Sequence, residues 1–190
     1  MLEFGLVRSG RGGPQSGLPS RLVPRAHLVD SIYVAQAAYR HMKESGYGRL
    51  VHTTSGSGLF GSFAQLNYAA AKAGIAGMSC TVAIEGARYG ILSNCIAPLA
   101  ARTGTTGGVF GKLTDRLAGS GEVFSAGGGR FARVFTAYTP GWTAPSDNGH
   151  TTPSEMAAHL ERIRDGSRFT IPVSGAEEVH HLARLLRTDS

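Results

Sequence analysis

The stretch TTSGSGLFGSFAQLNYAAAK, residues 53–72, carries two overlapping patterns. Gly56, Gly58 and Gly61 spell G-x-G-x-x-G, the pattern of a turn that cradles a dinucleotide pyrophosphate. Such a turn also needs an acidic residue about 20 positions later, at the end of the next strand, to bind the ribose. Glu85 falls inside a predicted helix instead. The sequence therefore disfavours a phosphate loop at these glycines.

The second pattern is Tyr-x-x-x-Lys, formed by Tyr68 and Lys72, with Ser55 before it. Residues four apart share a helix face, so the ammonium group can lie near the phenol. A nearby cation favours the phenolate form, which suits a general acid/base for an alcohol–carbonyl pair. Ser55 follows an apolar strand, where open α/β sheets place ligand-contacting groups. The alternatives are a solvated Tyr–Lys pair beside a capping serine, or an Ala/Gly-rich packing helix.

The flanking sequence predicts helices alternating with strands. Apolar residues at helical spacing predict a helix from His27, with Gly46 as its C-cap. RLVHTT (49–54) and ILSNCIA (91–97) are predicted to be buried strands. An Ala/Gly-rich helix from about 65 to 88 is predicted between them. This order is typical of a parallel sheet covered by helices, an α/β fold.

Sequence after Pro98 predicts three further elements. EVFSA and RFARVFTA flank a glycine triplet at 127–129 and are predicted to pair as a hairpin. The order Thr-Pro-Ser-Glu at 152–155 combines an N-cap, a first-turn proline and a returning glutamate, so a helix should begin there. Ser174 and Glu177 repeat the capping-box spacing before a predicted terminal helix.

Composition narrows the class of protein. The 190 residues are 42% hydrophobic and 17% charged, which fits one globular domain. The net charge is +6, but the arginines are scattered and form no basic helix face, so no nucleic-acid partner is expected. The first 26 residues are rich in Gly, Pro, Ser and Arg and predict a solvated tail. A transit peptide is the alternative.

Cysteine and histidine usage argues against disulfide and metal sites. Cys80 and Cys95 fit neither a disulfide framework nor a metal-binding pair, so a reducing, cytoplasmic location is expected. His180 and His181 are adjacent, which points them about 100° apart on a helix, so no metal site is expected. No apolar run approaches the roughly 18 residues that span a bilayer, so no membrane partner is expected.

Ser55, Tyr68 and Lys72 in this spacing, followed by ILSNCIAP, resemble the catalytic half of the short-chain dehydrogenase/reductase family. Within it, GLFGSFAQLNYAAAKAGIAGMSCTVAIEGARYGI is most similar to the hydroxyacyl-CoA dehydrogenase domains of multifunctional beta-oxidation enzymes. The resemblance covers about residues 27 to 103, and GGGRFARVFTAYTPGW and TTPSEMAAHLERIRD resemble that subgroup's C-terminal extension. It implies a Rossmann-type, doubly wound parallel sheet with flanking helices.

The resemblance implies a role for each matching residue. Tyr68 would exchange a proton with the substrate oxygen, and Lys72 would activate it and bond the nicotinamide ribose. Ser55 would orient the substrate carbonyl. His27 occupies the place of an asparagine that supports a proton-relay water in many members; a helix-start residue without a catalytic role is the equal alternative.

A nicotinamide cofactor, NAD or NADP, is the implied partner of the site. Besides Tyr68 and Lys72, the resemblance implies that Pro98 and Thr103 line the nicotinamide pocket. Leu99 stands where the family usually has the glycine after that proline. The implied substrate is a small ketone or alcohol, with a 3-hydroxyacyl-CoA as the narrower expectation.

The family's T-G-x-x-x-G-x-G turn and its N-N-A-G motif are missing from the sequence. We therefore expect a sheet truncated on its N-terminal side: a disordered or non-homologous extension over 1–26, and a partial dehydrogenase domain over 27–190 with an extension from about 104. The first functional hypothesis is an oxidoreductase. The second is an inactive remnant, a homo-oligomer whose dimer contact the resemblance places on the two helices 27–45 and 65–88. The small residues that would allow close helix approach there are Ala69, Ala73, Ala76 and Gly77.

Overall fold

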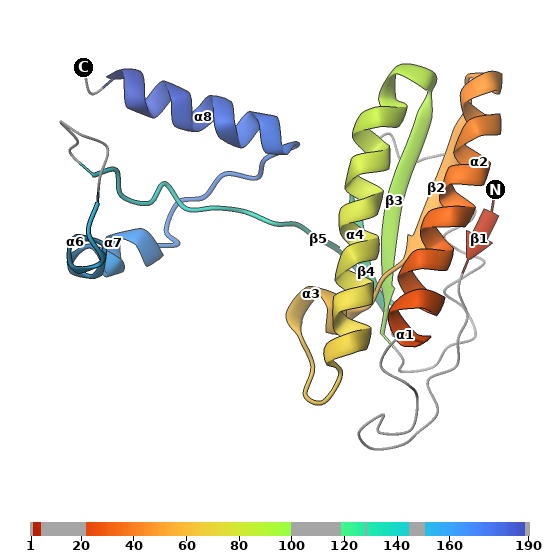
Figure 1. The fold of residues 1–190 in the computed structure, drawn as a ribbon, viewed down its shortest axis with the longest axis horizontal. Coiled ribbons are helices and arrows are strands. Elements are labelled where there is room, and N and C mark those ends of the chain that lie inside the picture. Colours follow the sequence, from red (N-terminus) through yellow and green to blue (C-terminus); the bar gives the residue numbers. More distant parts are fainter. Residues whose placement is uncertain (1, 5–21, 100–118, 128, 145–150, 189–190) are drawn as a thin grey trace. The chain divides into compact units, whose positions relative to one another are not determined.

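The chain forms two compact units, Met1–Val134 and Phe135–Ser190. The computed structural model in Figure 1 describes all residues except 1, 5–21, 100–118, 128, 145–150 and 189–190. Thr103, one of the predicted cofactor-binding residues, lies outside the described residues.

A mixed sheet forms the centre of the first unit. Its strands follow one another in chain order; neighbours from β1 to β4 are parallel, and β5 runs antiparallel to β4. The predicted α/β class, a mostly parallel sheet with flanking helices, is confirmed. The strands that the described residues form are β1 Leu2–Phe4, β2 Gly48–Thr53, β3 Ile91–Pro98, β4 Val123–Gly127 and β5 Arg130–Val134.

Two long helices cover one face of this sheet. In Figure 1, α2 and α4 lie side by side over β2 and β3. The parallel pairing of β2 with β3 requires the crossover that α4 supplies. The helical segments of this unit are α1 Leu22–Pro24, the π-helical turn η1 Arg25–Val29, α2 Asp30–Ser45, α3 Gly56–Phe60, α4 Leu66–Gly86 and the 3₁₀ turn η2 Ala87–Tyr89.

Small residues let the helices approach the sheet closely. Ala38 of α2 packs with Leu50 and Ile91 of the strands in one buried cluster. A Cβ added at Gly86 would lie 2.9 Å from the Cβ of Ile91, closer than carbon atoms normally approach. The glycine therefore permits the contact between the end of α4 and the start of β3. The predicted C-cap Gly46 is confirmed, with φ of 67° and its N–H donating to Met42 O.

The N-terminal region differs from the expectation. The helix predicted from His27 begins at Leu22 and passes through the π-helical turn before α2. Leu2–Phe4, within the predicted tail, pairs in parallel with β2 along Leu50–His52. The region is rich in Gly, Pro, Ser and Arg, so its composition did not predict the three-residue strand or the single helical turn. Pro24 is compatible with the first turn of a helix because no N–H is needed there. The proposed boundary at residue 26 stays a prediction.

The C-terminal hairpin and helix starts follow the sequence pattern. β4 and β5 pair around the predicted turn, where Gly129 has φ of 84°. In the second unit, Thr152 Oγ1 accepts from Glu155 N and Thr152 N donates to the Glu155 carboxylate, so the predicted capping box is present. Ser174 Oγ likewise accepts from Glu177 N at 3.3 Å. The helices that these residues begin are α6 Pro153–Ala158, followed by α7 Leu160–Arg164, and α8 Gly175–Thr188.

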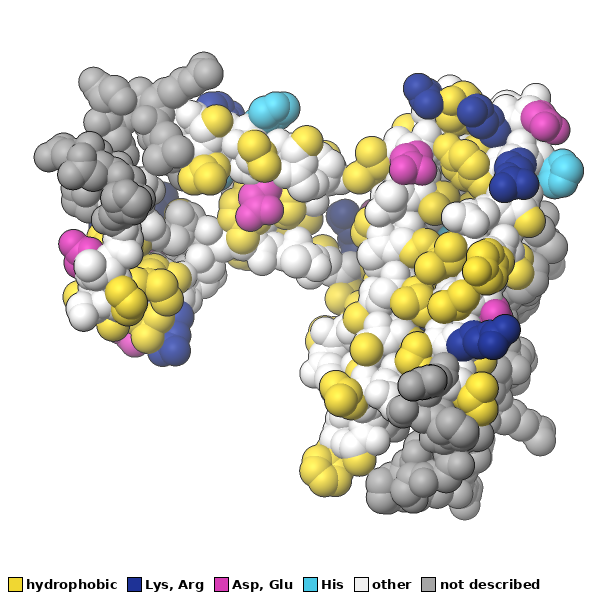
Figure 2. All heavy atoms as spheres, viewed as in Figure 1, with side chains coloured by type: hydrophobic (Ala, Val, Ile, Leu, Met, Phe, Trp, Pro, Cys, Tyr) yellow, Lys and Arg dark blue, Asp and Glu magenta, His cyan; other side chains and the backbone are white. Residues whose placement is uncertain are grey.

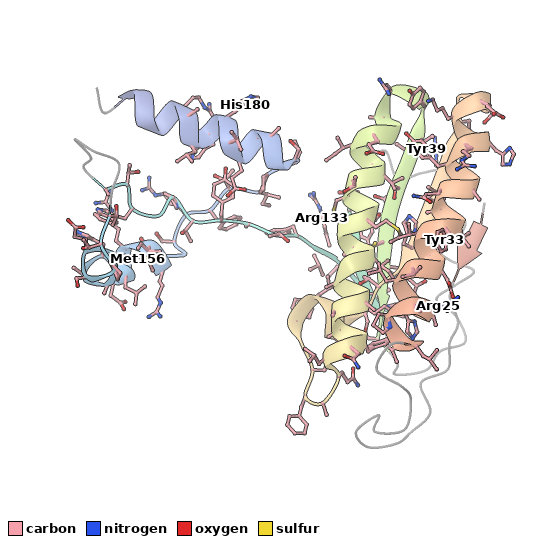
Figure 3. The ribbon with its side chains drawn as sticks, viewed as in Figure 1. Arg25, Tyr33, Tyr39, Arg133, Met156 and His180 are labelled. Carbon is pink, nitrogen blue, oxygen red and sulfur yellow. The ribbon has the colours of Figure 1, made fainter. Side chains whose placement is uncertain are left out.

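Aromatic contacts hold the second unit together. Trp142, the chain's single tryptophan, stacks on His159 with ring centroids 4.1 Å apart. Tyr138 pairs with Thr170 through two backbone hydrogen bonds, and its ring lies 5.8 Å from that of His181. Met156 and His180 mark this unit in Figure 3. None of the helices in the described ranges is long and apolar enough to cross a membrane.

His52 of β2 is a titratable group inside the core of the first unit. Only 8% of its surface is exposed, and burial lowers its pKa to about 4. The unfolded chain binds a proton at this residue near pH 6.5, where the folded chain does not. Its contribution to stability is therefore complete above about pH 6.5 and decreases as the pH falls toward 4.

We expect the free energy of unfolding to fall by about 3 kcal/mol between pH 6.5 and pH 4 because of His52, since each pKa unit corresponds to about 1.4 kcal/mol. Urea unfolding across this range measures the change. His52→Leu should flatten the pH dependence, whereas the matched change at the exposed His41 of α2 should leave it. An unaltered slope in His52→Leu would contradict the expectation.

Candidate active site

The candidate site lies where β2 ends and α4 begins. β2 ends at Thr53, Thr54 and Ser55 follow, and the short helix α3 leads by a loop into α4. Tyr68 is the third residue of α4 and Lys72 lies one turn further along. The carboxyl end of a parallel strand and the first turns of the next helix thus carry three of the four predicted catalytic residues.

Lys72 is tied to the end of β2 by two hydrogen bonds. Its ammonium group, on a residue only 5% exposed, donates to Thr53 O at 2.7 Å. The hydroxyl of buried Thr54 donates to the backbone carbonyl of Lys72 at 2.6 Å. Burial lowers the pKa of Lys72, an effect that nearby Cys95 partly opposes. The amine is therefore fixed in place at the edge of the sheet.

His27 and Tyr68 meet although 41 residues separate them. Their rings pack edge to face, with centroids 5.2 Å apart and an interplanar angle of 88°. Lys72 Nζ lies 5.8 Å from the centroid of the Tyr68 ring. Burial and the charge of Lys72 lower the pKa of His27, which favours its neutral form. The structure thus brings His27, Tyr68 and Lys72 into one cluster.

The π-helical turn accounts for the position of His27. A π-helical turn inserts one residue into a helix and commonly marks functional sites. η1 spans Arg25–Val29, so His27 is its central residue. The hydroxyl of Ser31 donates to His27 O at 2.6 Å, which satisfies that carbonyl. The sequence of this turn, RAHLV, contains no glycine or other residue that would have predicted it.

Ser55 has a structural role within the described residues. It is the N-cap of α3, and its Oγ accepts a hydrogen bond from Ser57 N at 3.2 Å. A hydroxyl that accepts this bond retains a hydrogen for donation to a substrate oxygen. Ser55 follows Thr53 and Thr54, the two residues that hold Lys72. Sequence reasoning missed both threonines, although their position directly before Ser55 was a usable signal.

The three glycines of G-x-G-x-x-G do not form a phosphate loop. Gly56 and Gly58 belong to α3, which is five residues long, and Gly61 ends it. A Cβ added at Gly58 would lie 2.7 Å from both Lys72 Cβ and Ala73 N. The glycine therefore permits close packing of α3 against α4 beside the lysine. This packing leaves no cradle for a pyrophosphate at Gly58.

The loop between α3 and α4 is held by side chains and presents apolar groups. Ser57 Oγ donates to Gln65 Oε1 at 2.8 Å, and Ser62 Oγ donates to Ser57 Oγ at 2.9 Å. Phe60, at the end of α3, is 74% exposed, and Phe63, within the loop, is 99% exposed. Two large apolar side chains are thus displayed in the segment that leads to the candidate tyrosine.

Of the residues predicted to line the nicotinamide pocket, Pro98 is described. It is the last residue of β3 and pairs with Ala126 of β4, so it lies at the same carboxyl edge of the sheet as the end of β2. Leu99 follows, and its N–H donates to Ala126 O at 2.7 Å. The structure records no contact between Pro98 and the His27–Tyr68–Lys72 cluster, within the part of the chain it describes.

We expect Gly58→Ala to destabilise the first unit by about 1–3 kcal/mol, because the added carbon would push α3 away from the backbone of α4. Gly56→Ala is the matched control: a Cβ there meets nothing within 4 Å. Urea unfolding of both variants measures the difference. Equal stability of the two variants would show that α3 does not pack against Lys72 as described.

Comparison with known proteins agrees with this fold. Residues 27–112 match the family model described as short chain dehydrogenase. A short-chain type dehydrogenase/reductase of Mycobacterium tuberculosis is 38% identical over 147 residues, which are 68% of this chain and 51% of the relative. A hydroxyacyl-CoA dehydrogenase of the same organism is 49% identical over 75 residues, 40% of this chain and 23% of the relative.

A solved structure extends the match to almost the whole chain. The full-length peroxisomal multifunctional enzyme type 2 of Drosophila melanogaster aligns with a TM-score of 0.80 and 28% identity, over 98% of this chain and 37% of that one. The chain is therefore similar over residues 27–112 to the short-chain dehydrogenase family. It spans about half of the length of the first of these relatives and less of the other two.

Proposed function

We propose that this chain carries the catalytic residues of an oxidoreductase that interconverts a hydroxyl and a ketone with a nicotinamide cofactor. The observation that carries the proposal is the cluster of a half-buried tyrosine, a buried lysine and a histidine at the carboxyl edge of a parallel sheet. Open α/β sheets bind ligands at this edge. The match of residues 27–112 to the short chain dehydrogenase family model supports the same reaction class.

Tyr68 is the proposed general acid/base. In the direction of oxidation it accepts the proton of the substrate hydroxyl, and in reduction it returns a proton to the carbonyl oxygen. The ammonium group of Lys72 lies 5.8 Å from the centroid of the Tyr68 ring, close enough to interact electrostatically with charge that develops on the phenol oxygen during this transfer. Ser55 donates a hydrogen bond to the same substrate oxygen, and His27, packed against the phenol ring, assists proton exchange.

The described residues fit one end of the cofactor. The buried ammonium group of Lys72 at the sheet edge is suited to bond the hydroxyls of the nicotinamide ribose, with Pro98 and Thr103 proposed as further contacts. The glycines at 56–61 do not cradle the pyrophosphate, because residues of α4 occupy the space beside Gly58. The cofactor supplies hydride transfer, and the choice between NAD and NADP is left open by these residues.

We propose a 3-hydroxyacyl thioester as the substrate class. The name of the hydroxyacyl-CoA dehydrogenase relative supports this class. Phe60, the last residue of α3, and Phe63, in the loop before Tyr68, are both exposed and support a substrate with an apolar acyl chain.

Cys80 and Cys95 are both free thiols, which supports the proposed reducing, cytoplasmic location.

We expect Tyr68→Phe to lower the rate of 3-oxoacyl thioester reduction by about 10²–10⁴-fold, the usual contribution of a general acid/base. Phenylalanine keeps the ring that contacts His27, so the variant should fold normally. Tyr33→Phe is the matched control, since Tyr33 is 65% exposed on α2 (Figure 3). The decrease of NAD(P)H absorbance measures turnover. Full activity of Tyr68→Phe would remove the tyrosine from the mechanism.

A groove between α2 and α4 supports a second candidate, a catalytically inactive remnant that acts through a homodimer contact. The groove has a volume of about 490 Å³ and lies on the outer face of the helix pair. Figure 2 shows hydrophobic side chains over this face of the unit. Gly77 on α4 has open space where a Cβ would be, which permits close approach of another helix. The groove is lined by Ile32, Ala35, Gln36, Tyr39, Arg40, Met78, Thr81, Val82 and Glu85.

Cofactor titration separates the two candidates. Saturable NADH or NADPH binding, followed by the shift in melting temperature, supports the oxidoreductase, because a ligand that binds only the folded state stabilises it. No shift at millimolar cofactor supports the remnant.

We expect Thr81→Arg to convert a homodimer to monomer in analytical ultracentrifugation, because the long cation would occupy the groove. Ala37→Arg is the matched control, since Ala37 is exposed on α2 but does not line the groove. A dimer that survives Thr81→Arg would place the contact elsewhere.

A further inference from the structure

His52 is buried yet has an unpaired ring nitrogen. Its Nε2 is inaccessible to solvent and has no hydrogen-bond partner among the described residues. Leaving a buried polar group unpaired usually costs about 1–3 kcal/mol. Such groups in folded proteins commonly bind an internal water molecule. His52 directly precedes Thr53, the last residue of β2, and the candidate site lies at the end of this strand.

A small cavity adjoins His52 between α2 and β2. Its volume is about 10 Å³, close to the smallest space that holds one water molecule. The polar residues that line it are Ser31, His52 and Thr53, and the other lining residues are apolar. An internal water needs two to four polar partners, a number that three polar residues can supply.

Two residues of the cavity also hold the candidate catalytic residues. The hydroxyl of Ser31 donates to the carbonyl of His27 at 2.6 Å. The carbonyl of Thr53 accepts from the ammonium group of Lys72 at 2.7 Å. His27 comes from the π-helical turn and Lys72 from α4, so the cavity lies between the supports of residues on two different elements.

We propose that this cavity binds one internal water molecule, bonded to His52 Nε2, Ser31 and Thr53, and that His52 is thereby a positioning residue for Lys72 and His27. The water connects Ser31, whose hydroxyl bonds the carbonyl of His27, to Thr53, whose carbonyl bonds the ammonium group of Lys72. A neutral imidazole nitrogen either donates to this water or accepts from it, depending on the tautomer. The catalytic meaning of this arrangement rests on the proposed function, whereas the water site itself does not.

The first test detects the water in the wild-type chain. Nuclear Overhauser contacts between a long-lived water and the backbone amides of Ser31, His52 and Thr53 are expected in ¹⁵N-labelled protein. Their absence from all three amides overturns the proposal, whatever any variant does.

The second test measures how firmly Lys72 is held. The chain has only three lysines, so ¹³C-labelled lysine gives a simple spectrum that Lys72→Arg assigns. A fixed side chain has two distinct ε-methylene proton signals, and we expect these for Lys72 in the wild type. His52→Leu should merge them, and His52→Gln, which can still bond water, should keep them apart.

His41→Leu, at an exposed position of α2, is the matched control and should leave the Lys72 signals unchanged. Separate signals at wild-type positions in folded His52→Leu would overturn the positioning role. Both tests omit cofactor and substrate. An inactive chain that passes them would therefore disprove the proposed function and leave this inference standing.

Discussion

The hydrogen bond from the buried ammonium group of Lys72 to Thr53 O determines the geometry of the candidate site. Removing an ammonium ion from water costs several kcal/mol, so such a group persists only where polar partners hold it. Here one partner is a strand-end carbonyl, and the reciprocal bond from Thr54 fixes the lysine backbone to the same segment. These two bonds thus fix α4 to the end of β2, one helical turn from Tyr68.

The glycine-rich turn serves this contact. Gly58 lets α3 approach α4 beside Lys72, and Ser55 begins α3 directly after the strand. The residues that looked like a phosphate loop are therefore part of the packing around the lysine. Residues 53–58 thus contain Ser55, the two threonines that bond Lys72 and the glycine that packs beside it. This explains why two sequence patterns overlap in this segment.

Local patterns predicted much of this arrangement. The four-residue spacing of Tyr68 and Lys72 placed them on one helix face, and alternating apolar segments predicted β2, α4 and β3 with their order. The contact of His27 with Tyr68 was not predictable from spacing, since it depends on how two helices pack. The early helix start at Leu22 and the strand at Leu2–Phe4 were also missed, because packing outweighs the composition of that region.

Trp142, which stacks on His159 in the second unit, is the chain's single tryptophan, so its fluorescence distinguishes the two units. All other aromatic residues are tyrosine or phenylalanine, so excitation near 295 nm selects the indole of the second unit. Emission from that ring follows only the segment from Phe135 onward, while far-ultraviolet dichroism follows both units. The chain thus contains its own optical label for asking whether the second unit melts together with the first.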